Sequence, residues 1–377
     1  MAKAKHRRIV AKFGTNLLTA GSDRLDLQTM SALVVQAAQL RRQGVEIILV
    51  TSGAIAAGRH QLSAPVESGQ VISRQVYASI GQSALMRAYT DLFAWHEIVI
   101  AQALLTRRDL SDRSAYLNAR GTLVSLLDLG AIPIVNENDV VAVDEIADAV
   151  IGDNDSLSAL VANLVEADLL VMLTDSGGLF DKDPRAASDA KLIERVENID
   201  EVAALVEKRA AAERGTGGMA TKVEAARLAT SSGTAVVIAS GHETDALLRA
   251  ARGEATGTHF PARISRVEGR RRFLLAGLSA RGQLIVDSGA ATALQKQGKS
   301  LLPAGVKEIR GSFVRGDTVT IVNGDGRKIA YGIANYGDGD AQQICGKRSA
   351  DIATILGHDY GAEVVHRNNL VLLDEQR

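Results

Sequence analysis

Acidic and amide side chains are concentrated in two short segments of this chain. The segment NEND (136–139) follows the strand-like apolar run 131–135, and GDNDS (152–156) precedes the helical pattern 157–166. One Asp or Asn in each segment can cap a helix, but a larger set of such groups is costly to bury unpaired. Their density predicts a site that binds an ammonium group, a metal ion or a phosphoryl group in transfer.

Two lysines stand beside glycine-rich turns. Lys12 lies near the end of the apolar strand 8–13, next to Gly14, and Lys222 ends the segment GTGGMATK (215–222), which runs into a helix. Backbone N–H groups at a helix start, together with a lysine, favour an anion. The spacing of the glycines and the lysine in 215–222 fits neither the Walker A pattern GxxxxGK[ST] nor the dinucleotide-binding pattern GxGxxG. The alternatives without a binding function are that Lys12 is an ordinary surface lysine and that 215–222 is a flexible surface loop.

Two further strand ends carry small polar residues. TSGA (51–54) places Ser52 and Gly53 at a helix start, where N–H groups can hold an anion. Thr174 and Asp175, followed by Ser-Gly-Gly, suit a ribose or a base edge. A plain turn and a two-glycine loop remain alternatives. None of these motifs contains a Ser/His/Asp or Cys/His set, which favours phosphoryl transfer, where positioning and charge neutralisation dominate.

Alternating strands and helices position these motifs. Strands are expected at 8–13, 45–50, 98–105, 131–135, 168–173 and 234–239, and helices at 27–40, 54–59, 71–94, 116–129, 157–166, 199–213, 219–231 and 245–252. Gly14 and Thr15 are expected in a turn. This alternation predicts an α/β fold with a mostly parallel sheet and helices on both faces. Ligands of such sheets bind beyond the carboxyl ends of the strands, where all the motifs lie.

The pattern changes after residue 260. We expect a first domain over 1–260, a basic linker over 261–272 and a small, mainly β domain over 273–377, with short strands and frequent Gly and Asp turns. Residues 323–326 in NGDGRK have the composition of a tight hairpin turn.

Composition excludes several classes of protein. The 377 residues include 43 Lys and Arg against 44 Asp and Glu, and aromatic residues are only 3%, so neither a strong polyanion field nor many base-stacking rings are present. Cys345 is the only cysteine, which excludes an intrachain disulfide and a cysteine zinc cluster. No apolar segment approaches the roughly 20 residues of a membrane span. We therefore expect a soluble, cytoplasmic protein without membrane contact.

Together the motifs resemble the amino acid kinase family. The segments that carry the resemblance are VAKFGT, LVTSGAIAAG, PIVNENDVV, GDNDSLSALVA, LTDSGGLFDKDP and GTGGMATKVEAA. The order of these segments along the chain and their amino-acid sequences are most similar to those of members that phosphorylate L-glutamate. The segment 287–317, DSGAATALQKQGKSLLPAGVKEIRGSFVRGD, resembles a PUA domain. The resemblance therefore implies the amino acid kinase fold followed by a small PUA-like barrel.

The resemblance also implies an activity and a site. The activity is ATP-dependent phosphorylation of the side-chain carboxylate of L-glutamate to glutamyl 5-phosphate, with Mg2+ on the phosphates. The implied catalytic residues are Lys12, Asp155 and Lys222, with Asp155 holding the two lysines. The implied glutamate-binding residues are Ser52, Gly53, Asp139 and Asn154. The implied ATP-binding residues are Lys12, Thr174, Asp175, Thr216, Gly217, Gly218, Met219, Ala220, Thr221 and Lys222.

Regulation and partners follow from the same resemblance. It implies the first step of proline biosynthesis, inhibition by proline, a homo-oligomer (dimer or tetramer) and a glutamyl phosphate reductase as a partner. We expect the segment 140–151, between the two acidic motifs, to contribute to proline inhibition.

Two other functions stay open on the sequence. Another kinase of this family would act on aspartate, acetylglutamate, carbamate or a nucleoside monophosphate with the same fold. A protein that binds or modifies RNA is the alternative from another class. Residues 273–360 hold ten Lys and Arg against eight Asp and Glu, a weak basic footprint, so we expect RNA at most as an accessory partner.

Overall fold

The computed structural model describes residues 4–62, 70–142, 154–182, 184, 187, 189–212, 217–264 and 280–373. Two compact units are present: Met1–Ser111 with Ala119–Ser265, and Asp112–Asn118 with Arg266–Arg377. Residues 265–272 of the predicted linker lie outside the described residues, and the predicted domain boundaries stay predictions.

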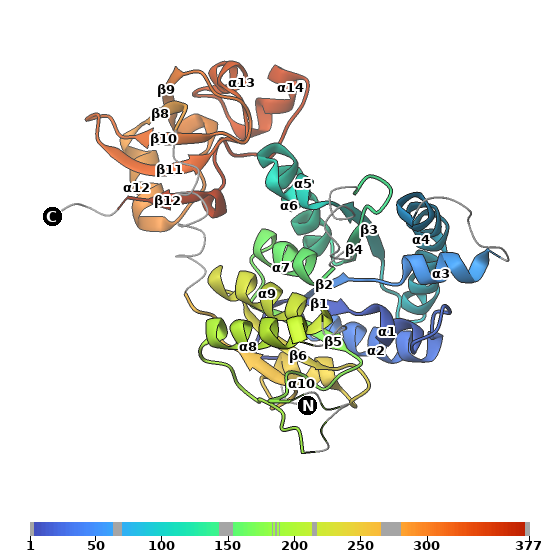
Figure 1. Cartoon of the computed structure of the whole chain (residues 1–377). Coiled ribbons are helices and arrows are strands. Elements are labelled where there is room, and N and C mark those ends of the chain that lie inside the picture. The colour runs from blue at the N-terminus through green and yellow to red at the C-terminus, as the bar shows by residue number, and fades with distance from the viewer. Residues whose placement is uncertain are drawn as a thin grey trace. The chain divides into compact units, whose positions relative to one another are not determined.

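The first unit is built on a mostly parallel sheet (Figure 1). Among the described residues its strand order is β3-β4-β2-β1-β5-β6-β7, and only β7 runs antiparallel to its neighbour. The central strands are mostly apolar, as expected for strands covered on both faces, and Lys12 of β1 is a buried exception. The bounds are β1 Arg8–Phe13, β2 Glu46–Val50, β3 Ile100–Leu105, β4 Ile132–Glu137, β5 Leu169–Thr174, β6 Ala235–Ser240 and β7 Thr258–Phe260.

Helices cover both faces of this sheet (Figure 1). Ile9, Ala11 and Phe13 of β1 belong to one apolar cluster with buried residues of α1, α2, α4 and α10. The other face contacts α7 and α9. The bounds are α1 Thr15–Thr19, α2 Leu27–Arg42, α3 Ala54–Gln61, α4 Gln70–Ala94, α5 Arg107–Ser111, α6 Arg113–Asp128, α7 Asn154–Leu164, α8 Ile199–Ala212, α9 Gly217–Ser231 and α10 Ala246–Arg252.

Four local features differ from the sequence-based expectation. Thr15, which was expected in a turn, begins the short helix α1 (15–19), and α5 and β7 were not expected. Strand β4 continues to Glu137, because Asn136 and Glu137 pair with the end of β3. The first two residues of the acidic segment NEND are therefore buried strand residues (2% and 8% exposed), and the turn begins after them.

Two glycines bring α3 and α4 into backbone contact. A Cβ atom on Gly81 would lie 1.8 Å from the carbonyl oxygen of Ala54, and one on Gly58 would lie 1.9 Å from that of Tyr77. Only glycine permits so close an approach of two helices. Helix α4 is therefore held directly against α3, which starts immediately after Gly53.

The second unit has a five-stranded sheet among its described residues, with the order β12-β11-β10-β8-β9. Asn323 N–H donates to the carbonyl of Arg327 (2.9 Å) between antiparallel β10 and β11, which confirms the predicted hairpin. Helices α12 to α14 accompany the sheet in the described part of this unit. The bounds are β8 Gly282–Val286, α12 Ser288–Gln297, β9 Val306–Gly311, β10 Thr318–Val322, β11 Lys328–Ile333, α13 Asp338–Ile344, α14 Ile352–Leu356 and β12 Leu370–Leu372.

Candidate active site

Asp155 lies between two lysines that come from distant parts of the chain. Lys12 Nζ is 2.6 Å from Asp155 Oδ1, and Lys222 Nζ is 3.2 Å from Asp155 Oδ2. Thr221 Oγ1 also donates to Oδ2, at 2.8 Å. The structure thus brings together the three residues that the sequence analysis proposed as catalytic.

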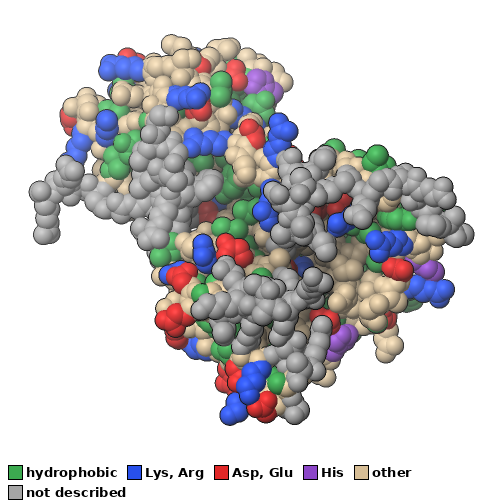
Figure 2. Space-filling model, in the orientation of Figure 1, with side chains coloured by type: hydrophobic (Ala, Val, Ile, Leu, Met, Phe, Trp, Pro, Cys, Tyr) green, Lys and Arg blue, Asp and Glu red, His purple; other side chains and the backbone are tan. Residues whose placement is uncertain are grey.

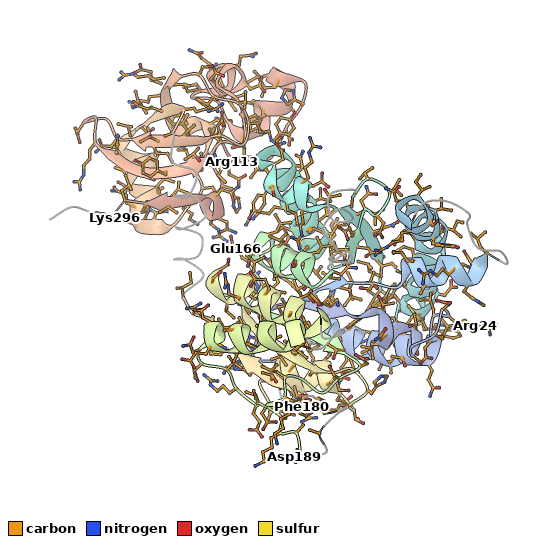
Figure 3. All side chains as sticks on the ribbon, viewed as in Figure 1. Arg24, Arg113, Glu166, Phe180, Asp189 and Lys296 are labelled. Atoms are coloured by element: carbon orange, nitrogen blue, oxygen red, sulfur yellow. The ribbon has the colours of Figure 1, made fainter. Side chains whose placement is uncertain are left out.

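The secondary structure explains how these three side chains meet. Side chains alternate along a strand, so Lys12 of β1 points away from the cluster that contains Ala11 and Phe13, toward α7 and α9. Asp155 stands in the first turn of α7, where the helix dipole favours a carboxylate. The chain just after α7 is tied to α6, because Arg120 donates to Glu166 at 3.2 Å. Glu166 is labelled in Figure 3.

Electrostatic interactions within the cluster keep the carboxyl group of Asp155 ionised. Burial alone would raise the pKa of Asp155, but the ammonium groups of Lys12 and Lys222 and the hydroxyl of Thr221 lower this pKa below its usual value. The Asp155 and Lys12 side chains are 4% and 7% exposed, and Lys222 is 15% exposed. A buried carboxylate therefore holds two ammonium groups near the carboxyl ends of the strands, where an anion can reach Lys222 most easily.

Residues 217–222 of the segment GTGGMATK form the start of α9. Gly217, Gly218, Met219, Ala220 and Thr221 lie in its first turns, whereas Thr216 lies outside the described residues. Lys222 Nζ also donates to the carbonyl of Gly218 (2.8 Å), so the lysine folds back over the helix start. The first N–H groups of a helix have no intrahelical acceptor. This end of α9 therefore offers N–H donors and a cation to an anionic ligand.

Thr174 and Asp175 lie at the carboxyl end of β5. Thr174 is buried, and its hydroxyl accepts from the N–H of Ser176 (2.9 Å), which shapes the turn. Asp175 is exposed and accepts from Asn16 Nδ2 at 3.3 Å. The two residues share the strand-end edge with Lys12, since β5 pairs directly with β1.

Two of the proposed glutamate-binding residues, Ser52 and Asn154, meet in a network of amides. Asn154 Nδ2 donates to Ser52 Oγ (3.0 Å) and to Asn136 Oδ1 (3.2 Å). Gly53 has φ +99°, the left-handed conformation that glycine adopts without strain. Asp139 lies half-buried in the turn after β4. Gly152 and Asp153 lie outside the described residues.

Gln82 belongs to this network and was not predicted from the sequence. Asn136 Nδ2 donates to Gln82 Oε1 of α4 at 2.8 Å. Asn136 belonged to a predicted motif, but it had no assigned role. Gln82 stands within a long helix and has no motif around it, so only the packing of α4 against α3 brings it to the site.

Within the described ranges, no group of three or more His, Cys, Asp and Glu side chains is arranged to hold a metal ion. No helix among the described residues is long and apolar enough to cross a membrane.

Comparison with known proteins identifies relatives over nearly the whole chain. Residues 7–240 match the amino acid kinase family, and residues 282–356 match the PUA domain. The chain is 50% identical over 368 residues to "Glutamate 5-kinase" of Dehalococcoides mccartyi (strain CBDB1), covering 98% of this chain and 99% of the relative. It is 48% identical over 373 residues to "Glutamate 5-kinase" of Shewanella halifaxensis (strain HAW-EB4), covering 99% and 100%. A solved UMP kinase from Bacillus anthracis matches with a TM-score of 0.46 and 14% identity, over 69% of this chain and 97% of that one.

Proposed function

Since the chain belongs to the amino acid kinase family, we propose that it transfers the γ-phosphoryl group of ATP to the side-chain carboxylate of L-glutamate. The names of its relatives indicate this substrate for them. The observation in the structure that carries the proposal is the buried Asp155 carboxylate with Lys12 and Lys222 on its two oxygens. This cluster presents positive charge without a general base.

The proposed reaction needs no proton transfer. A side-chain carboxylate oxygen of glutamate attacks the γ-phosphorus of ATP while the bond to the β,γ-bridging oxygen breaks, giving glutamyl 5-phosphate and ADP. The nucleophile is ionised at neutral pH, because the usual pKa of such a group is about 4.3. The difficulty is instead the approach of an anion to a polyanion, which fixed positive groups relieve.

We assign Lys12 and Lys222 to the transferring phosphoryl group. Asp155 would keep both ammonium groups aimed at it, acting through the lysines as a positioning residue. Residues 216–222, which include the N–H groups at the start of α9, would hold ATP phosphates, and Thr174 and Asp175 would contact the nucleoside. Mg2+ prefers phosphate oxygens, water and only one or two carboxylates, so we propose that the ATP phosphates hold it, where it would neutralise their charge.

We assign Ser52, Gly53, Asp139 and Asn154 to glutamate. The carboxylate of Asp139 suits the ammonium group of the substrate, and the N–H groups after Ser52 suit an anionic oxygen. Both segments follow the ends of strands, and Lys12 lies near the same end of β1, so a bound glutamate would direct its side chain toward the lysines.

Trapping the acyl phosphate with hydroxylamine tests this proposal. ATP, Mg2+ and L-glutamate should yield the hydroxamate, whereas aspartate, acetylglutamate, carbamate or a nucleoside monophosphate as the acceptor should give little product. Lys222→Ala is the inactive control. Folded protein that makes no hydroxamate would refute a carboxylate kinase, and preference for another acceptor would assign a different kinase of the family.

The cellular role extends the same proposal. We propose a cytoplasmic homo-oligomer, a dimer or tetramer, that supplies proline biosynthesis and is inhibited by proline. Since an acyl phosphate is labile, a glutamyl phosphate reductase is the expected partner. Of the segment proposed for inhibition, only 140–142 lie among the described residues, and Val140 and Val141 are 52% and 59% exposed. Proline inhibition that survives scrambling of 140–146 in an active enzyme would contradict this role.

RNA binding is the competing function from another class. On the face shown in Figure 2, Lys and Arg lie among Asp and Glu in both units. Such mixed charge supports at most weak binding to nucleic acid. A salt-sensitive gel shift with RNA would favour this alternative.

A further inference from the structure

The amide network beside Ser52 ends in two atoms that have no partner among the described residues. Gln82 Nε2 and Asn154 Oδ1 are both buried, and no described residue forms a hydrogen bond with either atom. One is a donor and the other an acceptor. A buried polar atom without a partner is costly, so each end of the network is suited to a polar group of a ligand.

The hydrogen bonds of the network all run in one direction. Asn136 Nδ2 donates to Gln82 Oε1, and Asn154 Nδ2 donates to Asn136 Oδ1. Each bond uses a donor of one amide and the acceptor of the next. A free N–H donor therefore remains at Gln82, and a free oxygen acceptor remains at Asn154.

Helix α4 turns one face toward the segment that follows β4. Gln75 and Gln82 are seven residues apart, about two helical turns, so they share a face. Gln75 Nε2 donates to the carbonyl of Val140 (3.0 Å), and Gln82 accepts from Asn136. The two contacts bracket Asp139, so Gln82 stands beside the proposed substrate site.

An α-amino acid carries groups that match the two free atoms. Its ammonium group is a donor, and its α-carboxylate is an acceptor. We infer, building on the proposed function, that Gln82 Nε2 donates to the α-carboxylate of the substrate while Asn154 Oδ1 accepts from its ammonium group. Gln82 is then a substrate-binding residue that selects acceptors with a free α-carboxylate.

The variant Gln82→Glu isolates the donor. Its carboxylate still accepts from Asn136 Nδ2, so the network persists, but a negatively charged oxygen replaces Nε2. The acceptors to compare are L-glutamate and its α-carboxamide analogue, which keeps the side-chain carboxylate and carries an amide in place of the α-carboxylate. Ser79→Ala, one turn away on α4, is the matched control, because the one hydrogen bond of Ser79 Oγ among the described residues goes to the carbonyl of Gln75 in its own helix.

We expect the two acceptors to respond in opposite directions. For L-glutamate, Gln82→Glu should raise KM roughly tenfold to a hundredfold, the effect of losing a hydrogen bond to a charged group. The variant should change kcat and the KM for ATP little. For the α-carboxamide analogue, KM should fall, because the new carboxylate accepts from the amide. Ser79→Ala should leave both KM values unchanged.

Two outcomes would overturn the inference, and both can be distinguished from a failure of the kinase assignment. Equal losses with both acceptors would assign Gln82 a purely structural role, and unchanged KM values would place the α-carboxylate elsewhere. Each requires that the unmodified protein turn over L-glutamate. If the unmodified protein gives no product, the proposed function itself has failed.

Discussion

The ion pairs of Asp155 predict a large loss of stability in Asp155→Asn. This change keeps the shape of the side chain but removes the charge between Lys12 and Lys222. At separations of 2.6 and 3.2 Å, an effective dielectric constant of about 20 gives gross attractions of about 6 and about 5 kcal/mol. Desolvation offsets much of this attraction.

The net loss of stability in Asp155→Asn should come mainly from Lys12, whose buried ammonium group loses its counterion. Lys222 is 15% exposed and can turn toward solvent, whereas Lys12 is 7% exposed and stays buried. Removing one partner of a buried pair costs about 3–5 kcal/mol, and we expect the free energy of unfolding of Asp155→Asn to fall by this amount. Urea unfolding followed by far-ultraviolet circular dichroism measures it.

Two comparisons make this measurement decisive. Asp91→Asn removes a carboxylate 3.9 Å from Arg87 in an exposed pair (70% and 85% exposed), and it should cost about 0–1 kcal/mol. Adding Lys12→Met to Asp155→Asn should cost less than the sum of the two single changes, because each removes the same interaction. Unfolding of Asp155→Asn at the same urea concentration as the unmodified protein would refute the reasoning.

Three further predictions use other parts of the first unit. Lys222→Ala should lower kcat by about 10²–10³-fold, the typical cost of losing one group that stabilises transition-state charge, and an unaltered circular dichroism spectrum serves as the control; a loss below about tenfold would argue against the role. Gly81→Ala should lower the free energy of unfolding by about 1–3 kcal/mol, because its Cβ would lie 1.8 Å from the Ala54 carbonyl; unchanged urea unfolding would mean that the helices have room to separate. Burial, aided by Arg195, lowers the pKa of His259, so protonation of the unfolded chain should remove stability as the pH falls below about 6.5. His259→Gln should flatten this decline in urea titrations at neutral and mildly acidic pH, and an equally steep decline would assign the effect to other groups.

Strong local patterns made most of the first sheet predictable. A buried strand such as Glu46–Val50 needs a continuous apolar run, and that run is visible without neighbours. Strand β7 has only three residues and acquires its structure by pairing with β6, so no local signal marks it. Helix α1 was missed for a similar reason, since its five residues are stabilised by burial of Leu17 and Leu18.

The site was predictable where charged side chains stand near glycines or within an acidic segment. Lys12 and Lys222 stand beside glycines, and Asp155 belongs to an acidic segment, so their residue types alone indicated an anion site. Their assembly around one carboxylate requires the strand order, which a single sequence does not encode locally. Gln82 was not predictable, because its place depends on the contact between α4 and α3 at Gly81.

Strand β1 serves two purposes in alternate positions, and this constrains how the chain can change in length. Ile9, Ala11 and Phe13 enter the apolar cluster, and Lys12 points the other way, to Asp155. Deleting one residue within β1 would exchange the two faces: the ammonium group would enter the hydrocarbon layer, and an apolar side chain would meet Asp155. Only an insertion or deletion of an even number of residues keeps each side chain of this strand on its own face. As the chain evolves, the strand must therefore preserve this alternation more strictly than the identity of each residue.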